Sequence, residues 1–184
     1  KVLSENPKVK LLYVIPNFQN PTGKAWTLER RKAFMDVINK YDVMVIEDNP
    51  YGEIRFKGEF VPTLKSMDTQ GKIIYLGSFS KILAPGLRLA WMCANPEVIK
   101  QAELIKEGWD LQCNQFVQVQ AVAFMNSYDL EKHIQGIQQA YKDKCELMLA
   151  EMEKEFPANV KFTNRKAACL SGLSCRSTST PTLS

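Results

Sequence analysis

The sequence predicts an α/β domain with a mostly parallel sheet, followed by the beginning of a smaller α+β domain. Short apolar runs alternate along the chain with stretches of helical periodicity, which is the order that βαβ units produce. The runs are continuously apolar, as strands are when both faces of a sheet are covered. Polar clusters follow the runs directly, at the edge of a parallel sheet where ligands bind.

The expected elements follow one another in a regular order. The apolar runs predict strands at residues 11–15, 43–46, 72–77 and 89–94. Helical patterns cover residues 27–40, 95–107, 115–125 and 129–155. Thr27 and Asn95 stand where helix N-caps are needed, and Pro96 suits the first turn of the helix that it opens.

The long helix predicted at residues 129–155 carries an apolar stripe with steps of three and four. Its members are Leu130, Ile134, Ile137, Tyr141, Cys145, Met148 and Met152. Such a stripe is typical of a face that packs on a core or on another domain. After this helix, residues 159–162 are expected to start a strand of the second domain.

The composition is that of an ordinary globular protein. Its 184 residues are 45% hydrophobic and 24% charged, and the net charge of +4 comes from interleaved acids and bases without a nucleic-acid-binding stripe. Five cysteines without a CxxC pair and a single histidine predict no metal site and no disulfide framework. Reduced thiols in the cytoplasm are expected. No apolar run reaches membrane-spanning length, so no membrane partner is expected.

Three polar clusters are predicted to meet at the carboxyl edge of the sheet. They are residues 17–23, 48–51 and 78–81. Lys81 places a primary amine in this region. Asp48 ends a buried strand, where a carboxylate is costly unless it meets a positive partner.

The remaining polar groups of these loops suit a phosphate-bearing ligand. Ser78, Ser80 and Arg88 offer two hydroxyls and a bidentate guanidinium, a set that suits phosphate. Asn20 and Tyr51 add hydrogen-bond donors. A phosphorylated aldehyde with a basic ring nitrogen would engage all of these groups together with Lys81 and Asp48. Pyridoxal 5′-phosphate is such a ligand.

Three motifs carry a resemblance to a known family. The segments "NFQNPTG", "IEDNPYGEIRF" and "GSFSKILAPGLRLAW" resemble the fold-type I pyridoxal-phosphate-dependent aminotransferases of class I/II. The similarity runs from about Val9 to Asn164 and is closest to the 2-aminoadipate, aromatic and branched-chain aminotransferases. Because the three motifs occur in the right order and spacing, they are far more specific together than any one alone.

The resemblance implies an activity and a role for each site residue. Lys81 forms a Schiff base with the cofactor and then moves the substrate Cα proton, in a ping-pong transfer of an amino group from an amino acid to a 2-oxo acid. Asp48 pairs with the ring nitrogen. Asn20 and Tyr51 contact the 3′-oxygen of the ring. The phosphate of the cofactor is bound by Ser78, Ser80 and Arg88. Members of the family work as homodimers.

The resemblance also implies that the chain is a fragment. Residues 1–127 are expected to be part of the large cofactor-binding domain, and residues 128–166 the linking helix and the start of the small domain. Residues 167–184 depart from the family pattern and are rich in serine and threonine. We interpret them as an atypical tail, with a shift of reading frame near Lys166 as the hypothesis. Neither Arg165 nor Arg176 is placed to be the family's substrate-binding arginine.

Two other functions remain open at this point. The same domain occurs as the effector-binding part of winged-helix transcription regulators, and a fold-type I lyase would carry the same cofactor residues. Other prominent residues are expected to be structural. Tyr13, Tyr75 and Trp91 are predicted to be core aromatics, Glu47 a structural or solvated acid, and His133 an exposed or packing side chain.

Overall fold

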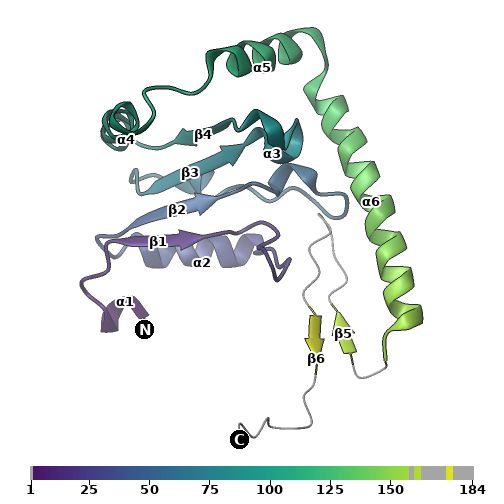
Figure 1. Cartoon of the computed structure of the whole chain (residues 1–184). Helices are drawn as coiled ribbons and strands as arrows, with labels where there is room; N and C mark the ends of the chain where they lie inside the picture. Colours follow the sequence, from purple (N-terminus) through teal and green to yellow (C-terminus); the bar gives the residue numbers. More distant parts are fainter. Residues whose placement is uncertain (1, 158–159, 163–172, 176–184) are drawn as a thin grey trace, which may run out of the picture.

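The computed structural model describes residues 2–157, 160–162 and 173–175 (Figure 1). The helices are α1 Val2–Glu5, α2 Leu28–Ile38, α3 Phe79–Ile82, α4 Pro96–Trp109, α5 Gln115–Ser127 and α6 Leu130–Glu155, with short 3₁₀ turns η1 Gly52–Ile54, η2 Lys65–Met67 and η3 Pro85–Leu87. The strands are β1 Leu11–Val14, β2 Met44–Asp48, β3 Ile73–Ser78, β4 Ala90–Cys93, β5 Val160–Phe162 and β6 Leu173–Cys175.

The main sheet has four strands in the order β1–β2–β3–β4. The first three are parallel, and β4 pairs with β3 in the antiparallel direction. In Figure 1 the arrowheads of β1, β2 and β3 therefore point to the same side, where α3 begins. This arrangement confirms the predicted α/β fold with a mostly parallel sheet.

One face of the sheet is covered by α2. Met35 and Ile38 of this helix pack against Val45 and Ile73 of the sheet, and all four side chains are buried. Neighbouring side chains of a strand point to opposite sides of the sheet. Every second residue therefore lies on the other face, which α2 does not cover. Tyr13 belongs to this open face and is 58% exposed. The prediction that Tyr13 is a core aromatic is therefore wrong.

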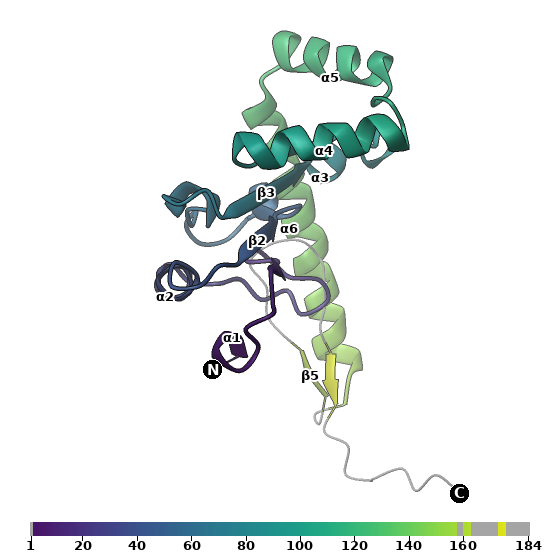
Figure 2. The same cartoon turned by 90° about the vertical axis from the view of Figure 1, so that its left-hand side faces the viewer.

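A second apolar cluster joins the sheet to α6. The buried side chains of Ile54 and Ile82 contact Ile134, Ile137 and Tyr141, which belong to the predicted stripe of the long helix. Gln138 of the same helix donates a hydrogen bond to the carbonyl of Glu53 at 2.7 Å. The stripe is thus a packing face, as predicted, and Figure 1 and Figure 2 both show α6 running alongside the sheet at the carboxyl ends of β1–β3.

The predicted N-caps are confirmed. Thr27 accepts a hydrogen bond from the amide of Arg30 at 3.3 Å, and Asn95 accepts one from the amide of Val98 at 2.9 Å. These side chains satisfy backbone donors that a helix leaves free at its start. Within the described residues, no helix combines the length and apolarity that crossing a membrane requires.

The strand expected near residues 159–162 is β5, which pairs with β6 in an antiparallel two-stranded sheet. Strand β6 lies within the segment predicted to be an atypical tail. The rest of that segment, Lys166 with the proposed frame shift, and the arginines at 165 and 176 lie outside the described residues.

Gly77 gives a first testable prediction. It lies opposite Trp91 in the β3–β4 register, and a Cβ atom at Gly77 would stand 2.2 Å from two ring carbons of Trp91. That ring packs edge-on against Phe79 with their centres 5.0 Å apart. We expect Gly77→Ala to push the indole off Phe79 and to lower the free energy of unfolding by about 1–3 kcal/mol in urea titrations.

Gly86→Ala is the matched control for this change. No atom lies within 4 Å of a Cβ built at Gly86. We expect its unfolding free energy to stay within about 0.5 kcal/mol of the unmodified protein. Equal unfolding midpoints for the two variants would show that the sheet accommodates a methyl group at Gly77.

Candidate active site

The candidate site lies at the carboxyl ends of β2 and β3. Lys81 stands on the one-turn helix α3, which starts directly after β3. Ser78 caps this helix, because its Oγ accepts a hydrogen bond from the amide of Ser80 at 3.0 Å. The Lys81 ammonium lies 5.9 Å from the ring centre of Tyr51. The structure therefore brings Lys81, Tyr51 and the two serines into one region.

Asp48 is the last residue of β2 and is partly buried. Its Oδ2 accepts a hydrogen bond from the Tyr13 hydroxyl on the neighbouring strand. This bond to Asp48, followed by burial and by the charge of the carboxylate, raises the pKa of Tyr13 to about 12. The phenol therefore stays a hydrogen-bond donor at neutral pH.

Sequence reasoning missed the connection between Tyr13 and Asp48. The strand "LLYVI" contains one polar atom among its side chains, the Tyr13 hydroxyl. A hydroxyl in an otherwise apolar strand is a signal that a hydrogen-bond partner lies nearby, and here the partner is Asp48 at the end of the neighbouring strand. The strand order that makes the two strands adjacent becomes visible only in the structure.

A buried polar network supports the loops on both sides of Asp48. Asn17 donates to Asn49 Oδ1 at 2.7 Å, and Asn49 donates to the Tyr75 hydroxyl at 2.9 Å. Arg31 of α2 donates to Asn17 Oδ1 at 2.6 Å and to the carbonyl of Pro62 at 2.9 Å. Burial lowers the pKa of this guanidinium, while the charge of Glu47 opposes the shift. Tyr75 thus belongs to a polar network rather than to an apolar core.

Glu47 is structural, one of the two roles predicted for it. It is fully buried, and its two oxygens accept hydrogen bonds from the amides of Leu64 and Lys65 at 2.9 and 2.8 Å. Burial raises the pKa of this carboxyl, and the two backbone bonds act in the opposite direction. Glu47 therefore fixes the loop around Leu64 and points away from the candidate site.

Asn20 lies in the exposed loop after β1. The side-chain hydrogen bonds nearest to Asn20 stay within the loop: Thr22 donates to Gln19 Oε1 through its amide and its hydroxyl, at 3.2 and 2.6 Å. Within the described part of the chain, no hydrogen bond joins the Asn20 side chain to Asp48 or Lys81. The loop places Asn20 beyond the end of β1, at the same edge of the sheet as the other candidates.

Arg88 is the candidate that the structure sets apart. It is exposed, has a left-handed backbone (φ 51°), and donates to the carbonyl of Pro85 at 3.2 Å. Its side chain borders a cavity of about 220 Å³ together with Asp110 and Asn114. Among the described residues, no hydrogen bond connects the guanidinium to Ser78 or Ser80.

The donor set fits pyridoxal 5′-phosphate. Asp48 has one oxygen bonded to Tyr13, which leaves Oδ1 to accept from a protonated ring nitrogen. Lys81 supplies a primary amine, and the hydroxyls at positions 78 and 80 supply donors for a phosphate. These chemical groups match the aldehyde, the ring nitrogen and the phosphate of the cofactor one for one.

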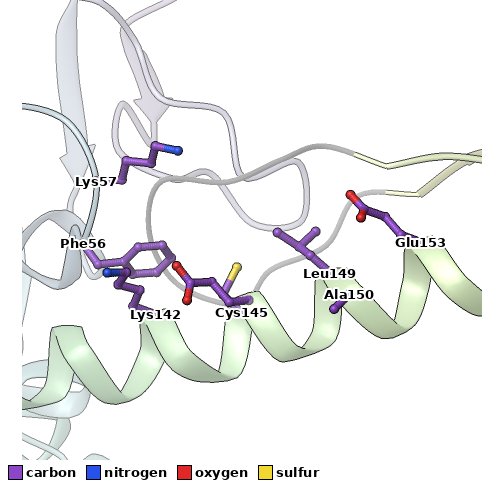
Figure 3. Close-up of a pocket in the computed structure, with 8 residues that line it drawn as sticks. Phe56, Lys57, Lys142, Cys145, Leu149, Ala150 and Glu153 are labelled. Carbon is purple, nitrogen blue, oxygen red and sulfur yellow. The ribbon is translucent and has the colours of Figure 1, made fainter.

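A separate cavity lies away from the candidate site. Its volume is about 520 Å³, and it lies between α6 and residues 56–57 (Figure 3). Figure 3 shows Cys145, Leu149 and Glu153 on the side of α6 that borders it, with Phe56 opposite. None of the candidate residues lines this cavity. This cavity is the space between α6 and the loop that follows η1.

Known proteins match this chain over most of its length. Residues 1–183 match the family described as aminotransferase class I and II. Aromatic-amino-acid aminotransferase 1 of Thermococcus litoralis is 45% identical over 159 residues, which are 86% of this chain and 38% of that protein. The crystal structure of a kynurenine aminotransferase from Pyrococcus horikoshii, in complex with PMP, has a TM-score of 0.85 and 42% identity, and the match covers 90% of this chain and 41% of that one.

A regulator also matches the chain. An uncharacterized HTH-type transcriptional regulator of Bacillus subtilis, YisV, is 33% identical over 145 residues, which are 79% of this chain and 30% of the regulator. This chain therefore spans between 30% and 41% of the length of these three relatives. Its fold, its three motifs and the family match agree, and the chain belongs to the aminotransferase class I and II family.

Proposed function

We propose that the full-length protein that carries this chain is a pyridoxal-phosphate-dependent aminotransferase, which transfers an amino group between an amino acid and a 2-oxo acid. The observation that carries the proposal is the position of Lys81 directly after β3, beside Tyr51 and one strand away from the Asp48 carboxylate. Family membership and the aminotransferase relatives support the same function.

Each residue of the site has a proposed role. When bound, the cofactor supplies an electron sink for the charge that develops at the substrate Cα. Lys81 holds the cofactor and moves the proton at that carbon. Asp48 keeps the ring nitrogen protonated through its free oxygen.

The other residues orient the cofactor. Ser78 and Ser80 bind the phosphate, with Arg88 as a third group once its side chain turns away from the carbonyl of Pro85. Asn20 and Tyr51 donate to the ring oxygen. These contacts fix the ring against Lys81, and this positioning supplies a large part of an enzyme's rate advantage.

The test is an assay of the full-length protein with pyridoxal 5′-phosphate, amino acids and 2-oxoglutarate. We expect cofactor-dependent formation of glutamate, together with a near-visible absorbance band from the lysine-bound cofactor. Release of ammonia and a 2-oxo acid without any acceptor would favour a lyase. Absence of both the band and turnover would contradict the proposal.

A regulator is the second candidate function, which the similarity to the Bacillus subtilis protein favours. In that case the same residues bind the cofactor and sense a ligand, and turnover is not required. A winged-helix domain elsewhere in the full-length protein, together with cofactor binding and no amino-group transfer, would decide for the regulator.

We further propose that the full-length protein is a cytoplasmic homodimer. The free thiols of Cys93 and Cys113 are consistent with a reducing compartment.

The domain boundaries predicted from the sequence, residues 1–127 and 128–166, are a further part of the proposal. Light scattering of the full-length protein would test the dimer, and limited proteolysis the boundaries.

A further inference from the structure

Tyr13 is joined to the candidate site by a side-chain hydrogen bond. Its hydroxyl donates to Asp48 Oδ2 from the adjacent parallel strand. Within the described residues this is the only side-chain hydrogen bond of Asp48. More than half of the Tyr13 side chain is nevertheless exposed, so burial of its ring does not explain where it lies.

The register explains how Tyr13 reaches Asp48. Tyr13 pairs with Ile46, two residues before Asp48, and residues two apart in a strand share one face of the sheet. That spacing is about 6.6 Å, which a tyrosine leaning along the strand can span with its hydroxyl. A shorter polar side chain at this position would fall short of the carboxylate.

We propose that Tyr13 is a positioning residue, whose hydroxyl holds one oxygen of Asp48 so that the other oxygen faces the ring nitrogen of the cofactor. This inference rests on the proposed function and goes beyond it, because it gives a role to a residue outside the three motifs. Oriented acceptors of this kind depend on the neighbours that fix their side-chain torsions.

The protonation state of Tyr13 supports this role. The titratable groups that face its hydroxyl are Asp48 at the end of β2 and Tyr51 just beyond it. Together with burial they raise its pKa to about 12, so the hydroxyl keeps its proton across the pH range in which enzymes work. The donor therefore does not switch off as the pH changes.

The first experiment measures cofactor affinity in the full-length protein. We expect Tyr13→Phe to raise the dissociation constant for pyridoxal 5′-phosphate about three- to tenfold, because a carboxylate that has lost its donor samples several orientations. Tyr128→Phe is the matched control. It removes the hydroxyl of an exposed tyrosine outside the candidate site and is expected to change the dissociation constant by less than about twofold.

A double-mutant cycle shows whether Tyr13 acts through Asp48. In an Asp48→Ala background, adding Tyr13→Phe is expected to leave the dissociation constant unchanged. If the tyrosine change has its full effect without the carboxylate, Tyr13 acts independently and the proposal fails. It also fails if Tyr13→Phe in the otherwise unmodified protein binds the cofactor as tightly as before.

A measurement without cofactor separates this inference from the proposed function. With ¹³C-labelled tyrosine, NMR at about pH 11 is expected to show the Tyr13 phenol protonated when phenols of ordinary pKa are mostly ionised. Asp48→Ala should let it ionise with them, and an ordinary titration in the unmodified protein would overturn the inference. If the Tyr13 phenol stays protonated in this measurement but the protein binds no cofactor, both the proposed function and the positioning role are refuted. Only the hydrogen bond between Tyr13 and Asp48 would then remain supported.

Discussion

Lys81→Ala is expected to remove the near-visible absorbance band of the full-length protein and to lower its turnover at least about a thousandfold. Lys81 is proposed both to hold the cofactor covalently and to move the substrate proton, and losing a positioned acid–base group costs about 10²–10⁴ in rate by itself. Reduction of the bound cofactor with borohydride, followed by peptide mass analysis, should locate the added mass on Lys81.

Lys100→Ala is a suitable control for the Lys81 variant, because Lys100 is an exposed lysine of α4. It should retain both the band and the activity. A Lys81→Ala protein that still carries covalently bound cofactor would contradict the assigned role. A protein in which the mass label falls on another lysine would move the site to that residue.

Arg31→Ala is expected to cost about 3–5 kcal/mol in the free energy of unfolding. The Arg31 side chain is fully buried, and it donates to Asn17 and to the carbonyls of Pro16, Val61 and Pro62. Alanine would leave the buried Asn17 Oδ1 without its donor and would open a cavity where the guanidinium lay, while the Pro16 carbonyl keeps its hydrogen bond from the Trp26 amide. Chemical denaturation of the chain, followed by circular dichroism, measures the change.

Two further variants sharpen this test. Lys32→Ala changes the next residue of α2, which is exposed, and is expected to alter the stability by no more than about 0.5 kcal/mol. Arg31→Lys keeps the charge but lacks the planar fork, so we expect a loss between those of the other two variants. If Arg31→Ala unfolds at the same denaturant concentration as Lys32→Ala, the buried network contributes little to stability.

Local patterns carried most of the fold prediction. The strands and helices follow from apolar periodicity, and the caps at Thr27 and Asn95 follow from side chains that satisfy the first free amides. The stripe on α6 was predictable for the same reason. Strand order and the antiparallel direction of β4 were not, because both depend on contacts between residues far apart in the sequence.

The candidate site was predictable as a set of residues but not as a geometry. The motifs supply Lys81, Asp48 and the serines, and the rule that ligands gather at the carboxyl ends of parallel strands brings them together. The partner of Asp48 was missed because Tyr13 lies in an apolar strand, where an aromatic residue is usually core. Its role depends on which strand is the neighbour, and a single sequence does not reveal that.

The order of the sheet has a practical consequence for handling the protein. Strands β1 and β4 are outermost, so within the described residues the backbone amides and carbonyls along their outer sides have no strand to pair with. An edge strand has unpaired backbone groups that readily form hydrogen bonds with a further strand. All four residues of β4 are exposed, so this edge is accessible. At high concentration this chain is therefore expected to self-associate by extending its sheet, so the unfolding titrations require dilute solutions.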